Sequence, residues 1–190
     1  MLFSRRDLVL GAAASAAAIT VACADEPQLT AEGLIAEPWF LDSFLDLPDD
    51  LAAAHKEGKR LAIMWELRGC PYCRETHLVN FADQEIASYI RTNFQVLQLN
   101  LIGSRKVVDF DGKEASEKEL AEKYAIRFTP TFQFFPSLSD GLAQKEPMAR
   151  EVARAPGYLK PRHFLAMFRF VREQAYERGT FLEYLSASKG

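Results

Sequence analysis

Apolar runs and helical repeats alternate along most of this chain. Residues 61–65 are continuously apolar and residues 94–101 alternate apolar with polar, so both segments predict strands, as does the Phe-rich segment 131–135. Residues 148–152 predict a further strand that pairs back on the third. Helices are predicted from capping residues, prolines and helical spacing at 51–57, 70–80, from Asp83 onward, and at 116–124, 161–177 and 181–185. This order predicts an α/β fold with a mixed central sheet flanked by helices.

Composition narrows the class of protein. The chain has 190 residues, of which 48% are hydrophobic and 12% aromatic, so it can build a substantial core and is expected to form one domain. Its net charge is −3, with acidic and basic residues well mixed. Such a balance gives neither a basic surface for nucleic acid nor a polybasic patch for membranes. We therefore expect no nucleic-acid partner.

The N-terminus has the pattern of an export signal. Residues 4–8 (Ser-Arg-Arg-Asp-Leu) resemble a twin-arginine motif, and the Ala-rich apolar run 8–22 that follows is short for a membrane span. Residues 22–24 (Ala-Cys-Ala) fit a signal-peptidase site with cleavage before Asp25. Lipid attachment at Cys23 is the alternative, although the residues before it fit that pattern poorly. Export by either route places the protein in the bacterial cell envelope, with the periplasm expected.

These patterns divide the chain into three parts. We expect an export signal at 1–24, an N-terminal extension at 25–47 and the folded domain at 48–190. Cleavage before Asp25 leaves two of the three cysteines, and these are only two residues apart. A disulfide that closes so short a loop removes little chain entropy, so a purely structural bridge is a poor explanation for the pair.

The two cysteines form the motif Cys70-Pro71-Tyr72-Cys73, directly after the first strand. Proline suits the first turn of a helix, so Cys70 is expected at the helix N-terminus and Cys73 one turn inside. The positive end of the helix stabilises a thiolate there. Cys70 is therefore the candidate nucleophile, and Cys73 is placed to resolve a mixed disulfide by attacking it.

Several neighbours are expected to tune this pair. Arg68 and Arg74 add positive charge, while Pro71 and Tyr72 between the cysteines tune the redox potential without fixing the direction of electron flow. Glu66 has two interpretations that the sequence leaves open: a proton acceptor for Cys73, or a solvated charge at the end of a strand.

Together with a second motif further along the chain, the cysteine motif makes this sequence resemble proteins with the thioredoxin fold. The residues that carry the resemblance are Cys70-Pro71-Tyr72-Cys73 and the segment 128–131 (Phe-Thr-Pro-Thr). The resemblance implies that Pro130 is cis and faces the cysteines, and that Thr129 and Pro130 bind the backbone of a substrate. Two departures stand out. Many thioredoxins have an acidic residue where Met64 stands, and Pro-Tyr between the cysteines is the glutaredoxin type.

More narrowly, the chain is similar to periplasmic thioredoxins of the SoxW type. The similarity lies in Trp65-Glu66-x-x-Gly69 before the cysteines, His77 after them, and Arg154-x-x-Gly157-Tyr158-Leu159 near the C-terminus. It implies a thiol–disulfide oxidoreductase that takes electrons from a membrane thiol transporter. It would pass them to periplasmic partners such as sulfur-oxidation proteins. The Cys70–Cys73 pair itself carries the electrons, so no diffusible cofactor is expected.

Two other functions stay open at this stage. The same dithiol can run in the opposite direction, as an oxidant or isomerase of the DsbA or DsbC type. In a different class, Cys70, Cys73 and His77 share one helix face and supply ligands for a copper-binding chaperone. A histidine at this position that simply packs at the helix surface is the plainer interpretation of His77.

Overall fold

A four-stranded mixed sheet forms the centre of the domain in the computed structural model, which describes residues 27–187. Its strand order is β4 (Phe94–Asn100), β3 (Arg60–Glu66), β7 (Thr131–Phe134) and β8 (Ala153–Pro156). Strands β3 and β4 run parallel, whereas β7 is antiparallel to both β3 and β8. The predicted α/β class with a mixed sheet is therefore confirmed.

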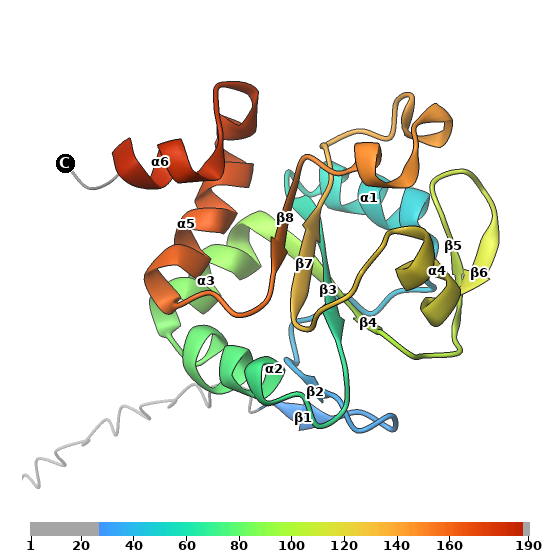
Figure 1. Cartoon of the computed structure of the whole chain (residues 1–190), viewed down its shortest axis with the longest axis horizontal. Coiled ribbons are helices and arrows are strands. Elements are labelled where there is room, and N and C mark those ends of the chain that lie inside the picture. Colours follow the sequence, from blue (N-terminus) through green and yellow to red (C-terminus); the bar gives the residue numbers. More distant parts are fainter. Residues whose placement is uncertain (1–26, 188–190) are drawn as a thin grey trace, which may run out of the picture.

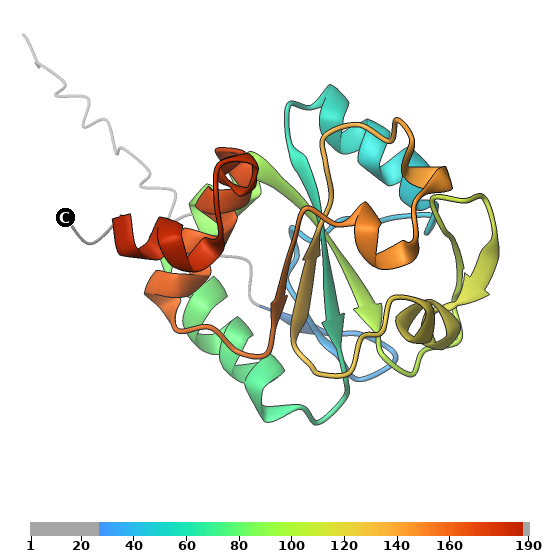
Figure 2. The ribbon, with the colours of Figure 1, turned by 45° about the horizontal axis from the view of Figure 1, so that its top comes forward.

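Helices cover both faces of this sheet (Figures 1 and 2). They are α1 (Leu47–Lys56), α2 (Pro71–Glu75), the π-helical turn η1 (Thr76–Phe81), α3 (Gln84–Asn93), α4 (Glu117–Lys123), α5 (Pro161–Arg172) and α6 (Phe181–Ala187). Three short 3₁₀ turns are η2 (Leu142–Gln144), η3 (Pro147–Arg150) and η4 (Ala175–Glu177). In addition to the central sheet, the described residues form two small antiparallel hairpins. One pairs β1 (Gln28–Leu29) with β2 (Ile35–Ala36), and the other pairs β5 (Lys106–Val108) with β6 (Glu114–Ser116). The segment from α2 to α3 forms the crossover that the parallel strands β3 and β4 require.

Strand β3 separates two hydrophobic cores because its side chains alternate between the faces of the sheet. Leu61, Ile63 and Trp65 pack with α1 and α4 on one face. Ala62 and Met64 pack with α3 and α5 on the other. All seven residues of β3 are buried, which explains why the sequence reads as an uninterrupted apolar run there.

The segment 27–46, here called the N-terminal strap, lies against the edge of the sheet beside β4. The backbone N–H of Leu41 donates to the carbonyl of Val96 over 2.8 Å. Trp39 and Phe40 pack edge-to-face against Phe81 of η1, with ring centroids 5.3 and 5.5 Å away. The export signal predicted at 1–24, with Cys23, lies outside the described residues.

Two predicted elements are wrong in position or extent. Residues 147–150 form the η3 turn rather than a strand, because Pro147 has no N–H to donate and Arg150 turns inward to bond Asp109 over 2.7 Å. The strand that pairs with β7 is β8, from Ala153. The helix predicted to reach residue 177 ends at Arg172 in the structure, since Gln174 adopts a left-handed conformation with φ of 53°.

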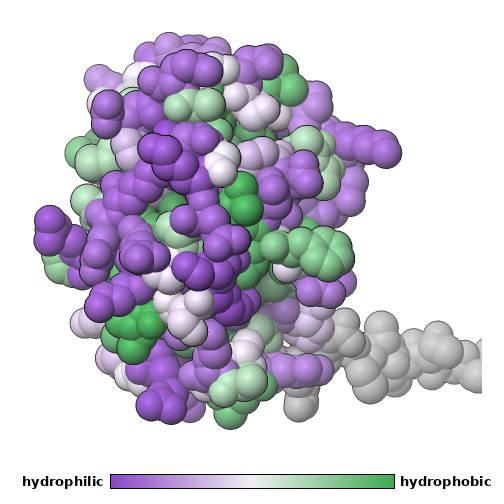
Figure 3. Space-filling model, turned by 90° about the vertical axis from the view of Figure 1, so that its right-hand side faces the viewer, coloured by the Kyte–Doolittle hydropathy of each residue, from purple (hydrophilic) through white to green (hydrophobic). Residues whose placement is uncertain are grey.

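The molecular face beside β5 and β6 is mostly hydrophilic, with separate apolar side chains between the polar ones (Figure 3). This distribution agrees with the mixed charges of the sequence. Within residues 27–187, no helix combines the length and the apolar character that crossing a membrane requires.

Candidate redox site

The cysteine motif lies at the carboxyl end of β3, where the strand leads into α2. Gly69 makes the turn with a φ of +79°, a conformation that glycine adopts without strain. Cys70 then caps the helix, and its Sγ accepts a hydrogen bond from the backbone N–H of Cys73 over 3.1 Å. Pro71 occupies the first helical position, as predicted. The local sequence thus places one sulfur atom at the positive end of a helix.

The two thiols have different environments. Cys70 is half-buried, whereas Cys73 is only 4% exposed, and the two are not joined by a disulfide. Burial raises the pKa of the Cys73 thiol well above its ordinary value, and the hydrogen bond with Cys70 and the negative charge of Glu66 raise it further. An accessible first sulfur and a buried, protonated second thiol suit attack by Cys70 followed by resolution by Cys73.

The loop before β7 faces this pair. The Thr129–Pro130 peptide bond is cis, as the resemblance to the thioredoxin fold implies. The Cys70 thiol lies 3.4 Å from the carbonyl oxygen of Thr129 and donates to it. On the other side of Pro130, its carbonyl accepts from the N–H of Gly157 over 2.7 Å, which fixes the loop to the end of β8.

Glu66 and His77 are both buried, and they form one polar cluster with Glu37 of the N-terminal strap. The His77 ring is fully buried, with Nδ1 at 2.7 Å from Glu37 and Nε2 at 3.1 Å from Glu66. The side-chain amide of Gln98 on β4 donates to the other oxygen of Glu66. Of the two interpretations of Glu66, the solvated charge is wrong because the carboxylate is 2% exposed.

The charge state of His77 follows from this cluster. Burial lowers its pKa, but the hydrogen bonds and negative charges of Glu37 and Glu66 outweigh burial and raise the pKa to about 9. His77 is therefore an imidazolium at neutral pH, held between two carboxylates.

The sequence did not reveal this cluster. His77 is neither a surface residue nor a third ligand beside the cysteines, because both of its ring nitrogens bond carboxylates. Strand periodicity offered a signal for Glu66, which has the same parity as Ala62 and Met64 and so belongs to the face that η1 covers. Nothing comparable pointed to Glu37, which is 40 positions from His77.

Two grooves flank the dithiol. The first, here called the aromatic groove, has a volume of about 570 Å³ and is lined by Tyr72, Phe128, Thr129 and Tyr158, among others. Phe128 is 65% exposed, and the rings of Tyr72 and Tyr158 stack with centroids 6.2 Å apart. Tyr72 is thus exposed between the two cysteines of the motif.

The second groove, here called the strap groove, has a volume of about 340 Å³ and lies between the β1–β2 hairpin and the redox helix. Both cysteines, Glu66 and Arg74 line it. Arg68 is exposed and its stem lies against the strap, where a Cβ built on Gly33 would come within 2.7 Å of it. Both arginines are therefore near the motif, as expected.

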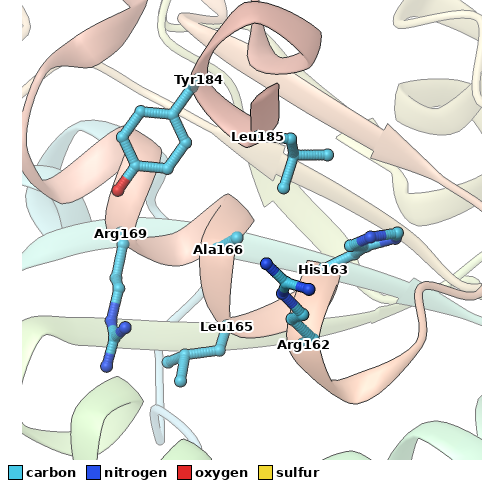
Figure 4. Close-up of a pocket in the computed structure, with 7 residues that line it drawn as sticks. All are labelled: Arg162, His163, Leu165, Ala166, Arg169, Tyr184 and Leu185. Atoms are coloured by element: carbon cyan, nitrogen blue, oxygen red, sulfur yellow. The ribbon is translucent and has the colours of Figure 1, made fainter. Parts of the chain in front are cut away.

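Cys70 and Cys73 are the only cysteines in the part of the chain that the structure describes. A smaller pocket of about 160 Å³ between α5 and α6 is lined by Arg162, His163, Arg169 and Tyr184, and no cysteine lines it (Figure 4). Among residues 27–187, no group of three or more His, Cys, Asp and Glu side chains is arranged to hold a metal ion. With His77 turned away toward the carboxylates, the ligand set predicted for a copper chaperone is not assembled.

Comparison with known proteins places the fold in a family. The model of the thioredoxin-like domain matches residues 47–172. The chain belongs to the thioredoxin-like family. Among solved structures, this thioredoxin-like protein is similar to a thioredoxin-fold protein from Helicobacter pylori, with a TM-score of 0.55 and 22% identity over 79% of this chain and 87% of that one. A thioredoxin from Thermus thermophilus matches with a TM-score of 0.48 and 24% identity over 65% and 82% of the two chains. No curated protein sequence matches the chain.

Proposed function

We propose that this protein is a thiol–disulfide oxidoreductase that reduces disulfides in protein partners. The observation that carries the proposal is the pairing of a half-buried Cys70, at a helix N-terminus and facing cis-Pro130, with a buried Cys73 whose backbone N–H bonds the Cys70 sulfur. This arrangement places one sulfur at a helix N-terminus where a partner can reach it, and keeps the second thiol one helical turn away.

The reaction proceeds in two exchanges. The Cys70 thiolate attacks one sulfur of a partner disulfide, which breaks that bond, releases the first partner thiolate and leaves a mixed disulfide. Cys73 then loses its proton and attacks Cys70, forming the Cys70–Cys73 disulfide and releasing the second partner thiolate. Two electrons pass to the partner, and its two thiolates take up protons from solvent.

Thr129 and Pro130 are proposed to hold the partner during these steps. Their loop faces Cys70, and the aromatic groove begins at Thr129. An extended peptide lying there would place its apolar side chains against Phe128 and Tyr158, which bury apolar area at low entropic cost.

Glu66 is proposed to accept the proton of Cys73. Its charge acts on the Cys73 thiol, and both groups line the strap groove, through which the proton can leave to solvent. The Glu66 carboxylate would thus take the role of the acidic residue that many thioredoxins have where Met64 stands in this chain.

The finer assignment rests on the sequence. The export pattern at residues 4–24 supports a periplasmic location, and the motifs around Trp65 and Arg154 support a SoxW-type reductant supplied by a membrane thiol transporter. The opposite direction of electron flow, that of an oxidant or isomerase, uses the same residues. The reduction potential of the Cys70–Cys73 pair distinguishes the two directions.

The direct test is to trap the intermediate. Cys73→Ser should accumulate a mixed disulfide between Cys70 and a disulfide-bonded protein such as insulin, detected by mass spectrometry, with turnover reduced at least a hundredfold. Cys70→Ser, the matched control, should form no adduct. Adduct formation in Cys70→Ser, or full turnover in Cys73→Ser, would contradict the proposed roles.

A further inference from the structure

The polar cluster behind Cys73 is built from three separate parts of the chain. Glu66 ends β3, His77 belongs to η1, and Glu37 comes from the N-terminal strap. Each of the three side chains is at most 6% exposed. A buried charge that has no partner is strongly unfavourable, so these groups must be considered together.

The charges of Glu37, Glu66 and His77 offset one another only when all three side chains are present. With His77 protonated, one imidazolium lies between two buried carboxylates and bonds both of them. Without the cation, the two buried carboxylates would repel one another, which disfavours their charged forms. A protonated Glu66 has no capacity to accept the proton of Cys73.

The structure also shows what else contacts the cluster. Within residues 27–187, Gln98 of β4 donates to Glu66, and the rings of Phe40 and Phe81 lie 5.8 and 5.4 Å from the His77 ring. Cys73 of α2 is a titratable neighbour, through the charge of Glu66. Arg74 lines the strap groove together with Glu66, but within residues 27–187 no ion pair joins the two. The positive charge that bonds Glu66 is therefore that of His77.

We propose that His77 is a positioning residue that pairs with the Glu66 carboxylate and orients it in the strap groove, which Cys73 also lines, and that Glu37 fixes the His77 ring through Nδ1. The N-terminal strap then completes the proton-accepting side of the redox site, through Glu37. This inference rests on the proposed function, because it concerns the step in which Cys73 resolves the mixed disulfide.

The resolving step can be observed alone. Reduced protein attacks 5,5′-dithiobis(2-nitrobenzoate) through Cys70 and releases one coloured thiolate. Attack by Cys73 on the mixed disulfide then releases the second, which stopped-flow absorbance records as a separate unimolecular phase. If Glu66 is the base, the wild-type rate of this second phase should change little between pH 6 and 8. In Glu66→Gln it should rise about tenfold per pH unit, because the thiol must then ionise unaided.

His77→Gln tests the cation. Its second phase should be about tenfold slower than wild type at pH 6, because Glu66 has then lost the cation that favours its charged form, and should approach the wild-type rate by pH 9. Glu37→Gln keeps the cation and should change the rate less than about threefold. The double variant Glu37→Gln/His77→Gln removes the repulsion as well as the cation, so at pH 6 it should be faster than His77→Gln.

The matched control is Glu32→Gln. Glu32 lies in the same strap but bonds Asn100 over 3.1 Å instead of His77, so its variant should keep the wild-type pH profile. Circular dichroism checks that each variant is folded. NMR of the His77 ring in the wild-type protein needs no variant and should show an imidazolium at pH 7.

The outcomes of these experiments distinguish failure of this inference from failure of the proposed function. A His77→Gln profile parallel to wild type, a double variant as slow as His77→Gln, or a neutral His77 ring at pH 7 would overturn the inference and leave the dithiol chemistry intact. Absence of the second phase in the wild-type protein would overturn the proposed function itself, and this inference with it.

Discussion

At the scale of single residues, His77 departs furthest from the environment that its position in the sequence indicates. A histidine one turn beyond a cysteine pair reads as a surface residue or a ligand, but this one is buried between Glu37 and Glu66. Its partners are 40 and 11 positions away, and only the packing of the strap against η1 brings them together.

This environment makes stability depend on pH. The pKa of His77 rises from 6.5 to about 9 on folding, so the folded state binds the proton more tightly than the unfolded chain. The stabilisation is fully present below pH 6.5 and is lost as pH rises through about 9. Full loss corresponds to roughly 3 kcal/mol in the free energy of unfolding.

Urea unfolding at pH 6.5 and pH 9 measures this loss. The wild-type protein should become less stable over that interval. The double variant Glu37→Gln/His77→Gln, which removes the cation together with the repulsion between the two carboxylates, should lose most of the dependence. An unchanged pH dependence in the double variant would show that other groups cause it.

The cysteine chemistry, in contrast, was accessible from the sequence. Cys70 and Cys73 were predicted because their immediate neighbours specify them: a strand before the pair and a proline at the start of a helix. Pro130 was predicted through the resemblance to the thioredoxin fold. Glu37 was not predicted, since no local pattern distinguishes it from the other acidic residues of the strap.

At the scale of elements, the connection between β4 and β5 depends on a glycine. A Cβ at Gly103 would lie 2.0 Å from Oε2 of Glu117 and 2.9 Å from Cβ of Asn100. The Glu117 carboxylate is fully buried and accepts from the N–H of Asn100 over 2.8 Å and from the guanidinium of Arg105 over 2.6 Å. A methyl group at Gly103 would therefore displace a buried, bonded charge.

Gly103→Ala should lower the free energy of unfolding by about 2 kcal/mol, from overpacking and weakened hydrogen bonds. Gly179→Ala is the matched control. Its Cβ would meet only the exposed side chain of Glu183, and it should change stability by less than about 0.5 kcal/mol. Equal effects in the two variants would refute this role for Glu117.

Element types were easier to predict than element ends. Strand β3 and helix α5 were predicted because their apolar patterns are strong and bounded by clear signals. The strand at 148–152 was misplaced, because the inward turn of Arg150 toward Asp109 depends on a carboxylate 41 positions away. The π-helical turn that carries His77 has no signature in the residue pattern.

At the scale of the whole molecule, the sheet with its two cores is the rigid support for the dithiol. On the face covered by α5, Phe168 is fully buried, and its ring lies 4.9 Å from that of Phe94 and 5.1 Å from that of Phe134. These contacts join α5 to β4 and β7, the two neighbours of β3 in the sheet.

Phe168→Ala should cost about 4 kcal/mol in the free energy of unfolding, because it leaves a cavity in this core. Phe44→Ala removes the same atoms from a side chain that is fully exposed, so it should be nearly neutral. Comparable losses from both variants would mean that the α5 core is not a main source of stability.

The central claim is that Cys70 and Cys73 form a dithiol that donates electrons. Equilibrating the protein with dithiothreitol or glutathione buffers and counting free thiols gives the reduction potential of the pair. A reductant should have a potential near that of thioredoxin, about −270 mV. A potential near that of DsbA, about −120 mV, would mean that the reduced form is unusually stable, and would contradict the assignment in favour of an oxidant.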